Sequence, residues 1–189
     1  MQNFPGTAVY TIGYGQRRGP EVIDLLRRHG IQYLVDVRTA PYSRFRPEFS
    51  RQALEQALPP AGLRYVFMGD LLGGRPSDPS CYRDGKVDYT VLSRTPAYQQ
   101  GIKRLKNAWV QGLRVCLLCS EERPEECHRS KLIGQSLVEH GIPVRHIDAD
   151  GSVVDHEAVM RRLTGGQQCL FGMVLTSRKR YRVRESRLE

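Results

Sequence analysis

The segment richest in reactive side chains is Cys119-Ser-Glu-Glu-Arg-Pro-Glu-Glu-Cys-His-Arg129, which gathers thiols, carboxylates, an imidazole and guanidinium groups. Cys119 ends an apolar run, so we expect it at the end of a buried strand, with Glu121 and His128 close by. Cationic neighbours can lower the pKa of a thiol and make it a nucleophile. His128 titrates near neutral pH, which suits an acid or a base. We therefore predict that Cys119, Glu121 and His128 carry chemistry.

Three other interpretations of this segment are open. Cys119 could be a small packed residue, because free cysteines are commonly buried. Cys119, Cys127 and His128 could bind zinc or iron, but adjacent Cys and His side chains rarely point at one ion, and no second ligand pair has zinc spacing. We accordingly predict no metal site. A disulfide between Cys119 and Cys127 could instead act as a redox switch, if the strand end and the helix start are close enough.

Residues in three predicted loops are suited to holding an anion. Cys127 to Arg129 should begin a helix, where free backbone N–H groups and the helix dipole favour negative charge. Arginine forks bind pairs of carboxylate or phosphate oxygens. Asp36 could act as a general base or orient Arg38, and we count it with the reacting groups. The predicted substrate-binding residues are Gly13, Tyr14, Arg38, Ser43, Arg44, Cys127 and Arg129.

Hydrophobic patterns predict the elements that would bring these loops together. Apolar runs predict strands at 8–12, 32–37, 63–66, 113–119 and 144–147, and amphipathic stretches predict helices at 21–29, 51–58, 89–110 and 127–140. This alternation is typical of an α/β fold with a mostly parallel open sheet of about five strands and helices on both faces. Ligands bind such sheets beyond the carboxyl ends of the strands, so we expect the three loops to lie side by side.

The pattern divides the chain into a domain and a tail. We predict a single α/β domain over residues 1–164, interrupted by an irregular stretch from Gly69 to Asp88. Loops of that length are usually functional or mobile. Gly165-Gly166 begins the segment 165–189, which is basic at its end and which we predict to be a flexible tail.

Composition limits the environment of the protein. The net charge of +9 and the pI near 9.6 favour contact with anions. Five irregularly spaced cysteines and a start without signal-peptide features predict a reducing, cytoplasmic location. The apolar runs are strand-length, well short of the roughly 20 residues that span a bilayer, so we expect no membrane contact.

Several short motifs, taken in order, resemble one known family. They are Tyr-Thr-Ile-Gly at 10–13, Leu-Val-Asp-Val-Arg at 34–38, Pro41 with Ser43-Arg44, Leu72-Gly-Gly74, and the segment 119–129. Together they resemble the family called domain of unknown function 488, over about residues 8–147. The resemblance implies an α/β fold and the location of a site, without a reaction or a cofactor. The family commonly has His-Ser after the first motif, whereas this chain has Tyr14-Gly15, so any acid or base role of that His would pass to Tyr14 or be lost.

These observations favour an enzyme that binds an anionic, phosphate-bearing substrate, such as a nucleotide or a nucleic-acid end. An alternative is a non-catalytic nucleic-acid-binding or adaptor protein. The stretch Gln167-Gln-Cys-Leu-Phe171 resembles peptides that dock on the bacterial sliding clamp, with Leu170 and Phe171 as apolar anchors. A third interpretation is a metal or thiol redox sensor. The sequence does not decide whether the protein is an enzyme, and it identifies no cofactor.

Overall fold

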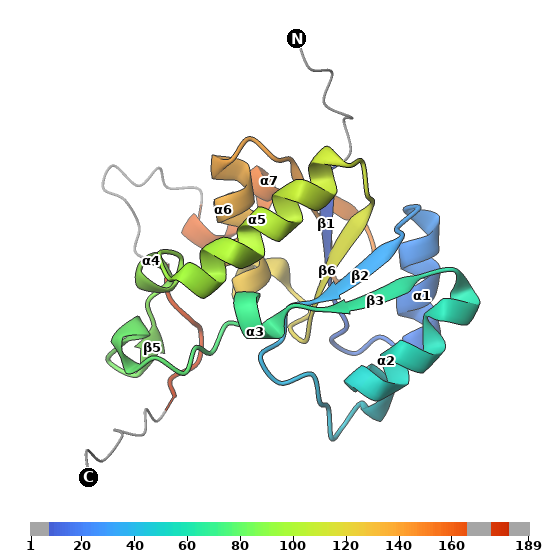
Figure 1. Ribbon diagram of the computed structural model, residues 1–189, viewed down its shortest axis with the longest axis horizontal. Coiled ribbons are helices and arrows are strands. Elements are labelled where there is room, and N and C mark those ends of the chain that lie inside the picture. The colour runs from blue at the N-terminus through green and yellow to red at the C-terminus, as the bar shows by residue number, and fades with distance from the viewer. Residues whose placement is uncertain (1–7, 166–174, 182–189) are drawn as a thin grey trace.

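The protein is built around one central sheet, seen here in a computed structural model that describes residues 8–165 and 175–181 (Figure 1). The sheet has six strands in the order β3-β2-β6-β1-β7-β8. The strands are β1 (Val9–Gly13), β2 (Tyr33–Asp36), β3 (Arg64–Phe67), β6 (Val115–Cys119), β7 (Val144–Ile147) and β8 (Val153–Asp155). All neighbouring strands are parallel except β7 and β8. The α/β class and the mostly parallel sheet are therefore confirmed.

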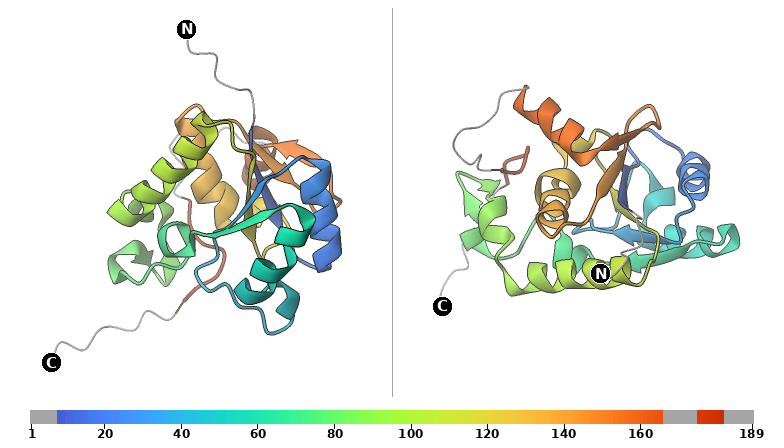
Figure 2. Two further views of the ribbon diagram at one scale, coloured as in Figure 1. Left: turned by 45° about the vertical axis from the view of Figure 1, so that its right-hand side comes forward. Right: turned by 90° about the horizontal axis from the view of Figure 1, so that it is seen from above.

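Helices cover both faces of this sheet (Figure 2). One face packs on α1 (Gly19–Arg28) and α2 (Arg51–Ala57), and the other on α5 (Pro96–Val110) and α6 (Gln135–Glu139). The described chain also contains α3 (Gly69–Leu72), α4 (Tyr89–Leu92), α7 (His156–Thr164), a π-helix (Arg129–Gly134) and short 3₁₀-helices at Pro47–Phe49, Pro59–Ala61, Pro79–Cys81 and Pro124–Glu126. Strand β6 is buried along its whole length because it lies between these two layers.

Two neighbouring strands, β1 and β6, are followed by helices that pack on opposite faces of the sheet. Strand β1 leads into α1 on one face, whereas β6 leads into the π-helix and α6 on the other. The two strands are paired, and their contact continues past their ends, because Tyr14 N–H donates to the Cys119 carbonyl at 3.1 Å. Such a switch point opens a crevice at the carboxyl edge of a parallel sheet. The predicted site loops leave the sheet at this edge.

Several elements differ from the predicted ones. The predicted helix over 89–110 is two helices, α4 and α5, because Thr95 caps a new helix whose first residue is Pro96. Strand β8 is an additional edge strand, short and only partly buried. The stretch from Gly69 to Asp88 contains α3 and the two-stranded ribbon of β4 (Tyr82–Arg83) and β5 (Lys86–Val87).

Residues 175–181 pack against this ribbon, although they belong to the segment predicted as a tail. Thr176 forms a bridge with Asp88, and Tyr181 N–H donates to the Gly85 carbonyl at 2.7 Å. These backbone contacts hold the segment beside β5 (Figure 1). Gln167, Leu170 and Phe171, which carry the clamp-like motif, lie outside the described residues. Among the residues that are described, no helix has both the length and the apolar character needed to cross a bilayer.

Candidate functional site

A polar cavity of about 250 Å³ opens at the carboxyl edge of the sheet, over the ends of β1, β2 and β6. Five of the predicted site residues line it: Tyr14, Arg38, Cys119, Glu121 and His128. They come from all three predicted loops, so the loops do converge.

Cys119, Glu121 and His128 form a compact cluster at this cavity. The thiol of Cys119 donates to Glu121 Oε2 at 2.9 Å, and Cys119 Sγ lies 3.6 Å from His128 Nδ1. Cys119 is 2% exposed and His128 is 8% exposed. Cys119 is therefore within contact distance of both Glu121 and His128. Asp36, the fourth predicted reacting group, lies outside this cluster and pairs with Arg38.

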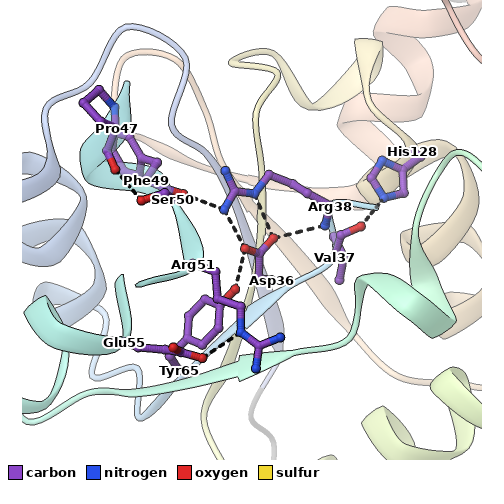
Figure 3. A network of polar contacts seen from close by, with 10 residues as sticks. All are labelled: Asp36, Val37, Arg38, Pro47, Phe49, Ser50, Arg51, Glu55, Tyr65 and His128. Carbon is purple, nitrogen blue, oxygen red and sulfur yellow. Dashed lines mark hydrogen bonds and ion pairs between the residues drawn. The ribbon is translucent and has the colours of Figure 1, made fainter. Parts of the chain in front are cut away.

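The orientation of His128 is set from β2. Its Nε2 lies 3.0 Å from the carbonyl oxygen of Val37, which can only accept a hydrogen bond (Figure 3). Nε2 therefore carries the proton of the neutral imidazole, and in that form Nδ1 directs its lone pair at the thiols. Gly74 packs on the other side of the ring, where an added Cβ would come within 2.8 Å of it. The irregular stretch from Gly69 to Asp88 thus forms part of the site.

The electrostatics of this cluster do not favour a free thiolate. Hydrogen bonding with Cys127, complete burial and the nearby Glu121 carboxylate raise the pKa of the Cys119 thiol. Burial opposes ionisation of Glu121, but hydrogen bonds from the thiols of Cys119 and Cys127 and the proximity of His128 lower its pKa to about 2. The residue types around Cys119 predict a lowered thiol pKa, but the Glu121 carboxylate and the Cys127 thiol produce the opposite shift.

Cys127 belongs to the same cluster but does not line the cavity. Its Sγ lies 3.3 Å from Glu121 Oε2 and 3.7 Å from His128 Nδ1. The donor atoms of Cys119, Cys127 and His128 all lie within 4.8 Å of one another. Adjacent Cys and His were expected to point apart, but Cys127 is extended (φ −113°, ψ 150°) and His128 is helical (φ −64°, ψ −22°), so their side chains converge.

Asp36 and Arg38 form a buried pair at the end of β2. The guanidinium of Arg38 donates to both carboxylate oxygens, at 2.8 and 2.6 Å, and to the Phe49 carbonyl at 2.7 Å (Figure 3). Tyr65 donates to the same carboxylate at 2.7 Å. Despite burial, the Asp36 carboxylate raises the pKa of Arg38. The carboxylate thus orients Arg38, whose guanidinium also lies 5.4 Å from the ring centre of Tyr14.

Arg129 has a different position from the predicted one. It is fully buried, and its guanidinium donates to the carbonyls of Glu121 and Glu122 rather than facing the cavity. Gly13 makes room for it, because an added Cβ would overlap with that guanidinium and with the Glu121 carbonyl. Gly13 and Arg129 therefore shape the loop after β6. The backbone N–H of Arg129 contacts Cys127 Sγ at 3.4 Å, so the start of this helix also faces inward.

The cations that do line the cavity include three that were not predicted. Arg75 comes from the irregular stretch, and Arg178 and Lys179 come from the segment 175–181. Arg75 lies over the ring of Tyr181 at 4.6 Å, and Arg178 pairs with Glu126 at 2.7 Å. The only sequence signal for them was their charge. Six predicted residues lie outside the cavity lining: Gly13, Asp36, Ser43, Arg44, Cys127 and Arg129. Of these, Ser43 accepts a hydrogen bond from Arg46 N–H, and Arg44 is exposed over Phe45.

Comparison with known proteins identifies one family. The family described as "Domain of unknown function DUF488" matches residues 19–135, a range that contains the ends of β2 and β6 and the Cys127-His128-Arg129 turn. No curated protein and no solved structure matches the chain.

Proposed function

This chain belongs to the DUF488 family, and we propose that it is an enzyme whose cavity binds an anionic, phosphate-bearing substrate. The reacting groups are those of the Cys119, Glu121 and His128 cluster. The substrate class is a nucleotide or a nucleic-acid end.

The observation that carries this proposal is the meeting of two kinds of side chain in one cavity. Cys119, Glu121 and His128 form one wall, and the cations Arg38, Arg75, Arg178 and Lys179 line the same space. Among the described residues, the cavity is lined by four cations and by two carboxylates, those of Glu121 and Glu126. A ligand held by the cations would lie against the reactive cluster.

The cations differ in how free they are to bind. Arg38 is fixed by Asp36, and Arg178 is paired with Glu126. Lys179 is exposed, and Arg75 rests on an aromatic ring. Arg75 and Lys179 are therefore the side chains best placed to meet an incoming phosphate, because a ligand does not have to break an ion pair to reach them.

An exposed aromatic side chain favours a nucleotide over a simple phosphate compound. Tyr42 lines the cavity and is 72% exposed. Aromatic rings beside a basic groove stack on nucleobases, a contact worth about 1–3 kcal/mol per base. The phosphate and the base of one nucleotide would then have separate places in the cavity.

A thermal-shift screen of nucleotides, sugar phosphates and oligonucleotides tests the binding step, because a ligand specific for the native state raises the melting temperature. The informative variant is Arg75→Ala/Lys179→Ala. Its matched control is Lys103→Ala/Arg104→Ala, which removes the same charge from the exposed surface of α5. We expect the cavity variant to bind about tenfold or more weakly and the control to bind like wild type. Equal weakening in both variants would contradict the proposal.

Turnover of the stabilising ligands tests the catalytic step. Glu121→Gln should abolish turnover while binding persists, because the change removes a charge from the cluster and leaves the cations in place. Undiminished turnover in this variant would overturn the assignment of the reacting groups. Stabilisation by oligonucleotides alone, equal in the cavity variant and wild type, would favour the nucleic-acid-binding alternative.

A further inference from the structure

We propose that Cys119, Cys127 and His128 bind a zinc-like divalent cation, with the Glu121 carboxylate as the fourth ligand. This inference deepens the proposed function, on which it rests for the role of the cavity. It assigns Cys119 as a metal ligand at the floor of the site.

The distances between the donor atoms already approach those of a tetrahedral ion. With Zn–S near 2.3 Å and Zn–N near 2.05 Å, a tetrahedral site needs a sulfur-to-nitrogen separation of about 3.6 Å. The Cys119 Sγ to His128 Nδ1 distance is 3.6 Å, and the Cys127 Sγ to His128 Nδ1 distance is 3.7 Å. The two sulfurs lie within 4.8 Å of each other, so the three donor atoms already surround one point.

Glu121 is the ligand that has to adjust. Its Oε2 lies 2.9 Å from Cys119 Sγ and 3.3 Å from Cys127 Sγ, closer than the roughly 3.6 Å expected around zinc. These short contacts are the hydrogen bonds that the protonated thiols make without a metal. Glu121 lines the cavity, so its side chain has space to move outward as the ion enters.

The surroundings of the ligands suit metal binding. A histidine that binds a metal through one nitrogen usually donates from the other to a carbonyl or carboxylate. His128 does this, since Nε2 bonds to the Val37 carbonyl and Nδ1 faces the thiols. The backbone N–H of Arg129 points at Cys127 Sγ, a contact that stabilises a thiolate.

The donor set selects the class of ion. Two sulfurs and an imidazole favour zinc and related borderline metals over Mg²⁺ and Ca²⁺, which prefer oxygen ligands. Two thiolates and a carboxylate carry three negative charges around a doubly charged ion. Arg75 and Lys179 line the same cavity, and their positive charges offset the charge that remains.

The site would be open on one side only. Cys119, Glu121 and His128 line the cavity, whereas Cys127 is 1% exposed and closes the rear. A phosphate oxygen entering the cavity could replace the Glu121 carboxylate on the ion. Such an exchange would place the metal against the bound substrate, as a Lewis acid.

The test uses the full chain, reduced with a phosphine and loaded with Zn²⁺ or Co²⁺ before dialysis. Elemental analysis should find about one ion per wild-type chain. The Co²⁺ form should show thiolate charge-transfer absorption and strong visible bands of a four-coordinate ion. Cys127→Ser should lose both signals, and the matched control Cys81→Ser, another buried cysteine that is not in the cluster, should keep them. Circular dichroism and a melting curve establish that each variant is folded.

The outcomes separate this proposal from the proposed function. Folded wild type that retains no ion, or an ion that stays in folded Cys127→Ser, would overturn the metal site. If phosphate ligands still stabilise wild type in that case, the proposed anion-binding cavity is retained without the metal site. If the ion binds and no phosphate ligand does, the metal site stands and the proposed function fails.

Discussion

The protein has two buried clusters built around histidine, and they differ in how their nitrogens are used. In the site cluster, His128 bonds to a carbonyl through one nitrogen and turns the other to two thiols and a carboxylate. In the second cluster, His146 lies between Thr11 Oγ1 at 2.7 Å and His156 Nδ1 at 3.0 Å, and His156 Nε2 faces Gln135 Oε1 at 3.4 Å. The second cluster is a continuous chain of matched partners.

This difference distinguishes a site from a structural network. Both clusters are buried and polar, but Cys119, Glu121 and His128 line the cationic cavity, whereas the second cluster reaches a different cavity through Gln135. The first also has several donor atoms crowded around one point, whereas the second pairs each ring nitrogen with one neighbour. Burial and polarity alone do not mark the functional group, so the surrounding space has to be considered as well.

The largest expected effect comes from the arginine beneath the site cluster. Arg129→Ala would remove a fully buried side chain and leave the Glu121 and Glu122 carbonyls without these donors. We expect the free energy of unfolding to fall by about 3–5 kcal/mol, from the lost hydrogen bonds and the space left behind. Urea denaturation measures this loss. A nearly unchanged midpoint would contradict this assignment and would favour an Arg129 that faces the cavity and binds ligand, as its position in the sequence predicts.

The second cluster should make the stability of the fold depend on pH. Burial lowers the pKa of His156 from 6.5 to about 4, and the pKa of His146 is also lowered. The unfolded chain therefore takes up protons first as the pH falls, so stability is full above pH 6.5 and is lost toward pH 4. For His156 the loss should be about 2–3 kcal/mol.

The variant His156→Gln tests the origin of that loss. Glutamine keeps a donor and an acceptor but does not titrate, so the fall in stability between neutral pH and pH 4 should be shallower than in wild type. Parallel stability curves for the two proteins would contradict the assignment of a buried neutral histidine.

A smaller effect is expected beside the site cluster, at Tyr65. Tyr65→Phe removes one hydrogen bond to Asp36, while Arg38 continues to pair with that carboxylate. We expect a loss of about 1 kcal/mol in unfolding free energy, with ligand binding unchanged. A large loss of ligand binding would instead place Tyr65 in the site.

The sheet could be predicted because most of its strands are continuous apolar runs. The three loops could then be placed together, because the carboxyl ends of parallel strands meet at one edge of the sheet. Strand β8 could not be predicted in this way, since Val153–Asp155 is short and only partly buried. The break between α4 and α5 had a local signal, Thr95 before Pro96, that the long amphipathic pattern outweighed.

Several residues of the cavity wall could not be predicted from the sequence, for a physical reason. Residues 175–181 are held in part by backbone contacts, such as Tyr181 N–H to the Gly85 carbonyl, and those contacts leave no side-chain pattern in the sequence. The inward turn of Arg129 depends on the space at Gly13, which only the packed structure reveals. The meeting of Cys127 and His128 likewise depends on backbone angles that the spacing does not specify.

The most direct test of the contrast between the two clusters follows the histidine ring nitrogens by NMR during a titration with inorganic pyrophosphate. We predict that the His128 signals shift and saturate, because His128 lines the cationic cavity, while those of His146 and His156 stay fixed. Shifts confined to His146 and His156, or a response absent from His128 while the protein binds pyrophosphate, would contradict the account.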